Sequence, residues 1–184
     1  MSHFYPGTAI EVGKIEKGSS KQLFDSIFMT GGITLSQVCI MTGLEPYLIQ
    51  NWVKRGFVSS PKKRLYSQSQ FARIIIINML REALQIEQIC ELISITALNI
   101  SDDTDDVIKD DDLYHRYVDM IAEENINVYD EDTVREAADK AAQGFDDGLP
   151  ISKRQISRIL QVMTCAYFAT ELRRKTCAKF NELT

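Results

Sequence analysis

The sequence lacks the usual marks of a secreted or membrane-spanning protein. Its first residues show no basic segment followed by an apolar stretch, and no run approaches the roughly 18 apolar residues that span a bilayer. We therefore expect a cytoplasmic protein that makes no membrane contact. Its hydrophobic content of 45% is sufficient for an ordinary globular core.

Patterns of metal ligands are also missing. The two histidines, His3 and His115, are isolated, and the four cysteines are far apart with no C-x-x-C pair. The acidic residues 101–112 have no glycine at the sixth position of a calcium loop. We expect reduced cysteines with a structural role, no metal and no cofactor.

No pattern in the sequence is typical of a catalytic site. A glycine-rich phosphate loop is missing, and so is a serine, histidine and aspartate arrangement beside a nucleophile turn. We predict that the protein is not an enzyme. A cluster of carboxylates with perturbed pKa values in a pocket is the finding that would reverse this prediction.

Charge is distributed unevenly, although the net charge of −5 at first argues against nucleic acid. Residues 46–81 contain seven basic and no acidic side chains, whereas residues 101–147 contain 17 acidic and four basic ones. A basic face can dock on DNA while an acidic part faces away. Charge alone leaves open the alternative that both segments are ordinary solvated surfaces.

Two short helices joined by a glycine turn are predicted in the first third of the chain. Thr34 and Gln37 form a capping box that opens the first helix. Pro46 suits the first turn of a second helix, over residues 46–55, and Gly56 suits its end. This order is a helix-turn-helix, whose second helix can lie in the major groove of DNA.

A basic wing is predicted after the second helix. Residues 57–58 and 65–66 have the composition of two short strands, and they flank a tip that holds Lys62, Lys63 and Arg64. We therefore expect a short β-hairpin at this point, followed by two further helices.

The fold class that we predict is all-α, with the wing as a short β-hairpin. The segments are a loosely ordered arm (1–21), a winged helix-turn-helix domain (22–95), an acidic linker (96–112) and a helical C-terminal domain (113–184). The last of these ends in a helix of about 30 residues, which is long for a globular protein.

The C-terminal helix carries a broad apolar face. Its stripe includes Ile156, Ile159, Leu160, Met163 and Tyr167. Such a face needs a partner helix, either within the chain or across a dimer. We expect a homodimer through the C-terminal helices, because two-fold proteins match paired half-sites on DNA. Packing against the helices at 113–144 is the alternative that the sequence leaves open.

This order of elements resembles the DNA-binding domain of bacterial MerR-type transcription regulators. Residues 43–57 (GLEPYLIQNWVKRGF) are similar to that family's helix-turn-helix, and residues 64–67 (RLYS) resemble the end of its wing. The resemblance covers about residues 33–95. Gln50 and Asn51 stand where the family usually has arginine and tyrosine. The sequence also resembles an uncharacterised bacterial family, a domain of unknown function, built on the same module.

We therefore predict a sequence-specific DNA-binding transcription regulator whose partner is double-stranded DNA. Helix 46–55 would read the major groove, and the wing at 57–66 would contact the backbone or the minor groove. Ile49 and Trp52 have the spacing of residues that pack against the first helix, which leaves the polar side chains outward. The candidate DNA-binding residues are Tyr47, Gln50, Asn51, Lys54, Lys62, Lys63 and Arg64.

Two questions stay open at this level. A protein-interaction adaptor that keeps the helix-turn-helix shape without binding DNA is the alternative function, and the acidic total favours it. A small-molecule effector of the C-terminal domain is also open. A dimer cavity lined by Tyr114, Tyr117, Tyr167 or Phe168 is a candidate site, although the same aromatic residues would serve a core equally well.

Overall fold

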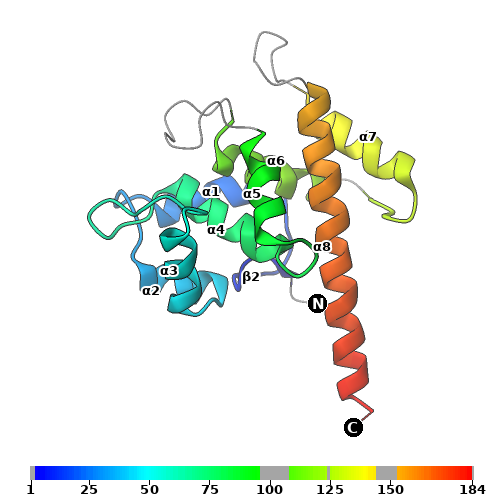
Figure 1. Cartoon of the computed structure of the whole chain (residues 1–184). Helices are drawn as coiled ribbons and strands as arrows, with labels where there is room; N and C mark the ends of the chain where they lie inside the picture. Colours follow the sequence, from blue (N-terminus) through cyan, green and yellow to red (C-terminus); the bar gives the residue numbers. More distant parts are fainter. Residues whose placement is uncertain (1–2, 96–107, 124, 144–152, 184) are drawn as a thin grey trace.

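The computed structural model describes residues 3–95, 108–123, 125–143 and 153–183. Within these ranges the protein is mostly helical and has one small two-stranded sheet (Figure 1). None of the helices described has the combined length and hydropathy of a membrane-crossing segment. The strands are β1 (His3–Phe4) and β2 (Glu11–Val12). The helices are α1 (Ser19–Ile27), α2 (Leu35–Thr42), α3 (Pro46–Lys54), α4 (Gln68–Leu80), α5 (Ile86–Ser94), α6 (Asp110–Glu123), α7 (Glu131–Ala141) and α8 (Lys153–Asn181).

Residues 3–12 form a hairpin, where the sequence predicted a loosely ordered arm over residues 1–21. Strands β1 and β2 pair antiparallel. Two buried side chains hold the turn between them: the Tyr114 hydroxyl donates to the Pro6 carbonyl oxygen at 3.0 Å, and the Asn78 amide donates to the Gly7 carbonyl oxygen at 2.9 Å. The partners are 108 and 71 residues apart in sequence, so no local pattern could indicate this order.

Helix α4 is the centre of the hydrophobic core. Its isoleucines at residues 74–77 are all fully buried, so the helix is covered on every side. It contacts α2, α5, α6 and α8. Near its start, the Phe71 ring packs on the Phe24 ring of α1 with a centroid separation of 5.3 Å.

The core continues from α4 into the C-terminal helices. Helix α6 packs against α1 and α4, and Asp110 at its start accepts a hydrogen bond from Nε of Arg73 at 2.6 Å. The predicted acidic linker at 96–112 therefore ends inside a helix. Residues 110–112 form the first turn of α6, where carboxylates are stabilised by the helix dipole, while residues 96–107 lie outside the described part of the chain.

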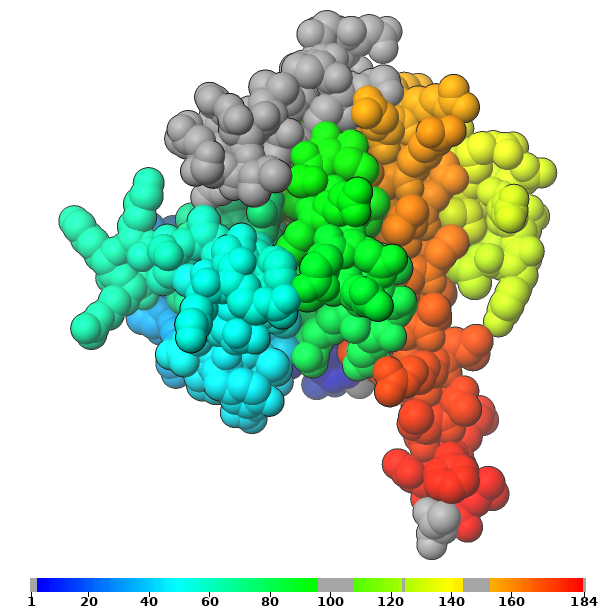
Figure 2. All heavy atoms as spheres, viewed as in Figure 1, coloured from blue at the N-terminus to red at the C-terminus, as the bar shows by residue number. Residues whose placement is uncertain are grey.

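Helix α8 has two different halves. Its first half packs on α4 and α7, and the residues that it buries there include Ile156, Ile159, Leu160, Met163 and Ala166. Much of the predicted apolar face is therefore satisfied within one chain, as in the intramolecular alternative. From Leu172 to Leu183 every residue is exposed, and Figure 2 shows this end of the helix, in red, standing clear of the body.

All four cysteines are free thiols. Cys39 and Cys90 are partly covered, and burial raises the pKa of each thiol, which keeps it protonated at neutral pH. Cys165 and Cys177 are exposed on α8. The expected role in packing therefore fits Cys39 and Cys90 but not Cys165 and Cys177. Sequence spacing alone did not show that these two cysteines lie on an exposed face of α8.

Candidate nucleic-acid interface

Helix α3 presents four of the candidate residues on its outer side. Tyr47, Gln50, Asn51 and Lys54 are all exposed, and their spacing of three and four residues places them on one face. The structure thus brings these four side chains together on one surface.

Local sequence explains why this face is turned outward. Thr34 and Gln37 form the predicted capping box at the start of α2, and Pro46 lies in the first turn of α3. Ile49 and Trp52 are 0% and 5% exposed on the opposite side of α3. Because the two helices pack through these apolar side chains, the polar side chains of α3 are left at the surface.

The three wing candidates lie at the tip of a tight turn. Lys62 and Leu65 form an antiparallel bridge, and the Leu65 N–H donates to the Lys62 carbonyl oxygen at 2.9 Å. Lys63 and Arg64 between them have φ values of 52° and 65°, the left-handed backbone of a type I′ turn. All three basic side chains are exposed, and Figure 2 shows this segment projecting from the body.

The wing is not the hairpin expected from the sequence. Residues 57–58 do not form a strand, because both of their N–H groups donate to the Trp52 carbonyl oxygen and so close the end of α3. Tyr66 pairs instead with Ile33, through backbone hydrogen bonds of 2.7 and 3.1 Å. The tip is therefore anchored to Ile33, just before the N-cap of α2, a partner that the sequence did not indicate.

One basic residue of the 46–81 stretch does not contribute to the outer surface. Nε of Arg73 lies 2.6 Å from Oδ2 of Asp110, and the two side chains are only 18% and 5% exposed. This ion pair joins α4 to α6. The outward positive charge of the stretch is accordingly smaller than the sequence count suggests.

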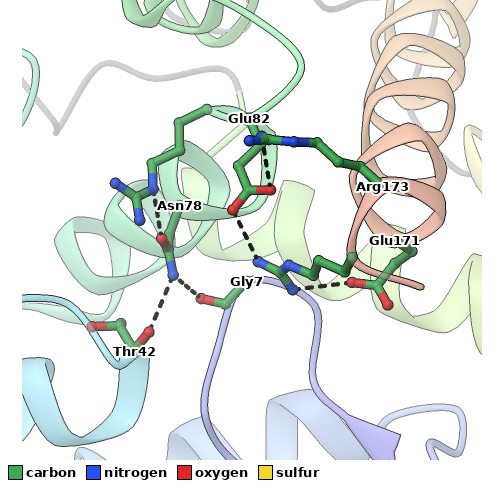
Figure 3. A network of polar contacts seen from close by, with 8 residues as sticks. Gly7, Thr42, Asn78, Glu82, Glu171 and Arg173 are labelled. Atoms are coloured by element: carbon green, nitrogen blue, oxygen red, sulfur yellow. Dashed lines mark hydrogen bonds and ion pairs between the residues drawn. The ribbon is translucent and has the colours of Figure 1, made fainter. Parts of the chain in front are cut away.

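A polar network behind the interface joins α2, the N-terminal hairpin and α4 (Figure 3). The Asn78 amide is buried and donates to the carbonyl oxygens of Gly7 and Thr42, at 2.9 and 3.2 Å. Its own oxygen accepts from Nε of Arg81 at 3.0 Å. Sequence reasoning missed this network. A lone asparagine inside the apolar run of α4 was the one available signal.

The C-terminal helices offer little to a metal or an enclosed ligand. Tyr114 and Tyr117 are 1% and 0% exposed, and Tyr167 packs edge-on against Tyr117 with ring centroids 6.1 Å apart. Burial raises the pKa of Tyr167 to about 12. Of the four aromatics suggested for a cavity, Phe168 lines a surface hollow, of about 380 Å³. Among the residues described, no group of three His, Cys, Asp or Glu side chains could hold a metal ion.

Helices α2 to α5 and the basic turn at residues 62–65 all lie within one matched region. Residues 34–117 match the family model described as Domain of unknown function (DUF1836). The predicted resemblance to a domain of unknown function is therefore confirmed. The DUF1836 match begins at the N-cap of α2 and ends in α6, so it also takes in the α4–α6 contact. No curated protein and no solved structure matches the chain.

Proposed function

We propose that this chain binds duplex DNA and regulates transcription, in the manner of MerR-type regulators. One observation carries the proposal: an exposed polar face on α3 lies next to a projecting basic tip, in a stretch with no acidic residue from 46 to 81. An α-helix fits the major groove, and cations beside it meet the phosphates. Of the 26 acidic residues of the chain, 17 fall within residues 101–147, outside this stretch of the sequence.

In this proposal α3 reads bases. Gln50 and Asn51 can each form two hydrogen bonds to adenine, and Lys54 meets guanine or phosphate. Tyr47, at the start of the helix, contacts the backbone through its hydroxyl. Exposure of all four side chains leaves them available without any rearrangement of the fold.

The wing tip contacts the backbone or the minor groove. Lys63 and Arg64 adopt left-handed backbone conformations, which cost a non-glycine residue about 1–2 kcal/mol. Asparagine and glycine are the usual residues of such a turn. Strain of this kind is retained most often where it serves a function, and here it presents cations at a protruding position.

Dependence on salt tests the proposal directly. Fluorescence anisotropy of labelled mixed-sequence duplexes should report binding at low ionic strength, with log K falling linearly against log salt. Selection of bound genomic fragments would then supply the preferred site and its symmetry. No binding to any duplex at low ionic strength would rule out a DNA-binding regulator.

We propose further that the regulator is a homodimer and that a second copy covers the exposed side of α8. An apolar series with spacings of three and four residues runs along this side, opposite the buried stripe. Beside it are two apolar hollows, one of about 540 Å³ lined in part by α7 and one of about 380 Å³ lined in part by the residues just before α7. The series is Val162, Cys165, Ala169, Leu172, Thr176 and Phe180.

Charge favours an antiparallel arrangement of the two α8 helices. Lys175 lines the smaller hollow from α8, with Arg174 just before it in sequence, whereas Glu131, at the start of α7, lines the larger hollow. In an antiparallel pair the basic end of one copy passes over the acidic start of α7 in the other. Phe180, 63% exposed in the single chain, then reaches the larger hollow of the second copy.

Changing Leu172 to Glu should convert this dimer into a monomer. The side chain is 54% exposed in one chain, so the substitution leaves the fold of the single chain intact while placing a charge in the apolar contact. Sedimentation or light scattering on the full chain measures the outcome. Met29→Glu is the matched control, because Met29 is 85% exposed and lies just after α1, far from α8 in sequence. A wild-type chain that is monomeric at micromolar concentration contradicts this part of the proposal.

A protein-interaction adaptor is the second candidate function. Ile40 on α2 and Tyr47 on α3 are 73% and 66% exposed, and apolar side chains at such positions favour contact with a protein. Replacing Ile40 with Ser separates the two functions. If the protein is a DNA-binding regulator, the Ile40→Ser variant keeps the affinity and salt slope of the wild type for duplex DNA. If it is an adaptor, neither the wild type nor the variant shows salt-dependent binding to duplex DNA.

A further inference from the structure

A second basic surface lies on the flank of α3, away from the wing. It is an open hollow of about 820 Å³ between the C-terminal half of α3, the turn that joins α4 to α5, and α8. Three arginines from these three elements line it: Arg55, Arg81 and Arg173. We call it the arginine hollow. In Figure 1 the wing and this region lie on opposite sides of α3.

Neighbouring groups hold each of the three guanidinium groups. Arg55 pairs with Glu87 at 2.7 Å and lies over the Phe57 ring, and Arg173 pairs with Glu82 at 3.4 Å. Figure 3 shows the Arg173 pair. These contacts fix Arg55 and Arg173 in position and pair each of them with one carboxylate, so the uncompensated positive charge of the hollow is that of Arg81.

Arg81 is the best placed of the three to take a ligand. Its Nε donates to the buried Asn78 oxygen, and Asn78 is itself held by Gly7 and Thr42. The guanidinium is thus anchored through one nitrogen, and within the described part of the chain its two terminal nitrogens have no partner. Two parallel N–H groups on a rigid fork match the two oxygens of a phosphate.

The place of the hollow beside α3 indicates which phosphates it meets. Leu48, Trp52 and Arg55 turn toward the hollow, about a quarter turn around α3 from the outer face that carries Asn51 and Lys54. A helix of about 10–12 Å diameter fills a major groove of about 12 Å, so the backbone of each DNA strand borders one flank of the helix. The wing stands at one border and the arginine hollow at the other.

We propose that the arginine hollow binds the DNA phosphates on the border of the groove opposite the wing, so that α8 supplies part of the DNA interface. This inference rests on the proposed function. It extends the contact surface to Arg81 and Arg173, neither of which lies on the helix-turn-helix or the wing. The shared chemistry is a phosphate group, and the source to which we assign it is duplex DNA.

The test compares two double variants. In the hollow variant Arg81 and Arg173 are both replaced by Gln, and in the control pair Arg154 and Arg158 are both replaced by Gln. The control removes the same charge from exposed positions at the other end of α8. In anisotropy titrations at several salt concentrations, the slope of log K against log salt should become shallower by about two for the hollow variant. The control pair should keep the wild-type slope. Hydroxyl-radical footprinting of the hollow variant should show that the DNA backbone loses protection along one side of the major groove only.

Equal slopes for the hollow variant, the control pair and the wild type would overturn the inference while leaving the proposed function standing. Absence of wild-type binding would overturn both. Equilibrium binding of inorganic tripolyphosphate separates the two sources of phosphate. If the hollow variant loses tripolyphosphate binding and keeps the wild-type DNA slope, the hollow serves a free phosphate compound, and its assignment to DNA is wrong.

Discussion

Reversing the charge at the wing tip should abolish most of the affinity for DNA. In the variant with Lys62, Lys63 and Arg64 changed to Glu, three cations at an exposed and projecting turn become anions. Each phosphate contact contributes about 0.9 to the salt slope, so the slope should become shallower by about three. We expect affinity at ~0.1 M salt to fall about 100-fold or more. Anisotropy titrations across salt concentrations measure both quantities.

A second wing variant separates loss of binding from loss of fold. Changing Lys63 to Asn and Arg64 to Gly supplies the residues that a type I′ turn prefers at its two left-handed positions. This change should raise the thermal midpoint slightly and still weaken DNA binding, since two cations are removed. If the affinity of this variant equals that of the wild type, the wing does not contact phosphate.

Replacing Gly7 with Ala should destabilise the protein more than a Gly→Ala substitution at any other glycine in the described part of the chain. Gly7 has φ of +74°, and a Cβ there would lie 2.4 Å from the Ile75 carbonyl oxygen and 2.8 Å from its Cγ2. The backbone strain and the overpacking together cost about 2–4 kcal/mol. For a chain of this size, that loss lowers the melting temperature by roughly 5–15 °C.

Two other glycines calibrate this prediction. A Cβ on Gly13 meets nothing within 4 Å, and its backbone is not left-handed, so Gly13→Ala should leave the melting temperature unchanged. Gly18 also has φ of +74°, but a Cβ added there would meet no atom within 4 Å. Gly18→Ala should therefore lower the stability only by the cost of the left-handed backbone, about 1–2 kcal/mol. Circular dichroism melts of the three variants order them. A Gly7→Ala midpoint equal to that of Gly18→Ala would show that the hairpin is not packed on α4.

Local patterns predicted the starts of α2 and α3 well. The capping box at Thr34 is present, and α3 begins at Pro46. Burial of Ile49 and Trp52 also follows from spacing. Each of these features depends on residues within a turn or two of the chain, where hydrogen-bonding and side-chain periodicity act directly. The seven candidate residues are all exposed for the same reason.

Predictions that required a distant partner did not hold. The N-terminal segment is ordered by Tyr114 and Asn78, and the wing pairs with Ile33 rather than with residues 57–58. No local pattern specifies such contacts, because their geometry is set only when α4 and α6 are in place. Sequence patterns therefore predicted contacts between residues near one another in the chain and missed those between distant residues.

The sequence by itself determined which residues of this protein stand at the surface of α3 and at the wing tip. Tertiary structure alone decided which cations lie together. Packing of α4 on α6 places Arg73 in an interior ion pair, and packing of α8 on α4 brings Arg173 beside Arg81 and Arg55. The reason is physical. Periodicity fixes the direction of a side chain relative to its own helix, whereas the position of one helix against another depends on the shape of the whole core.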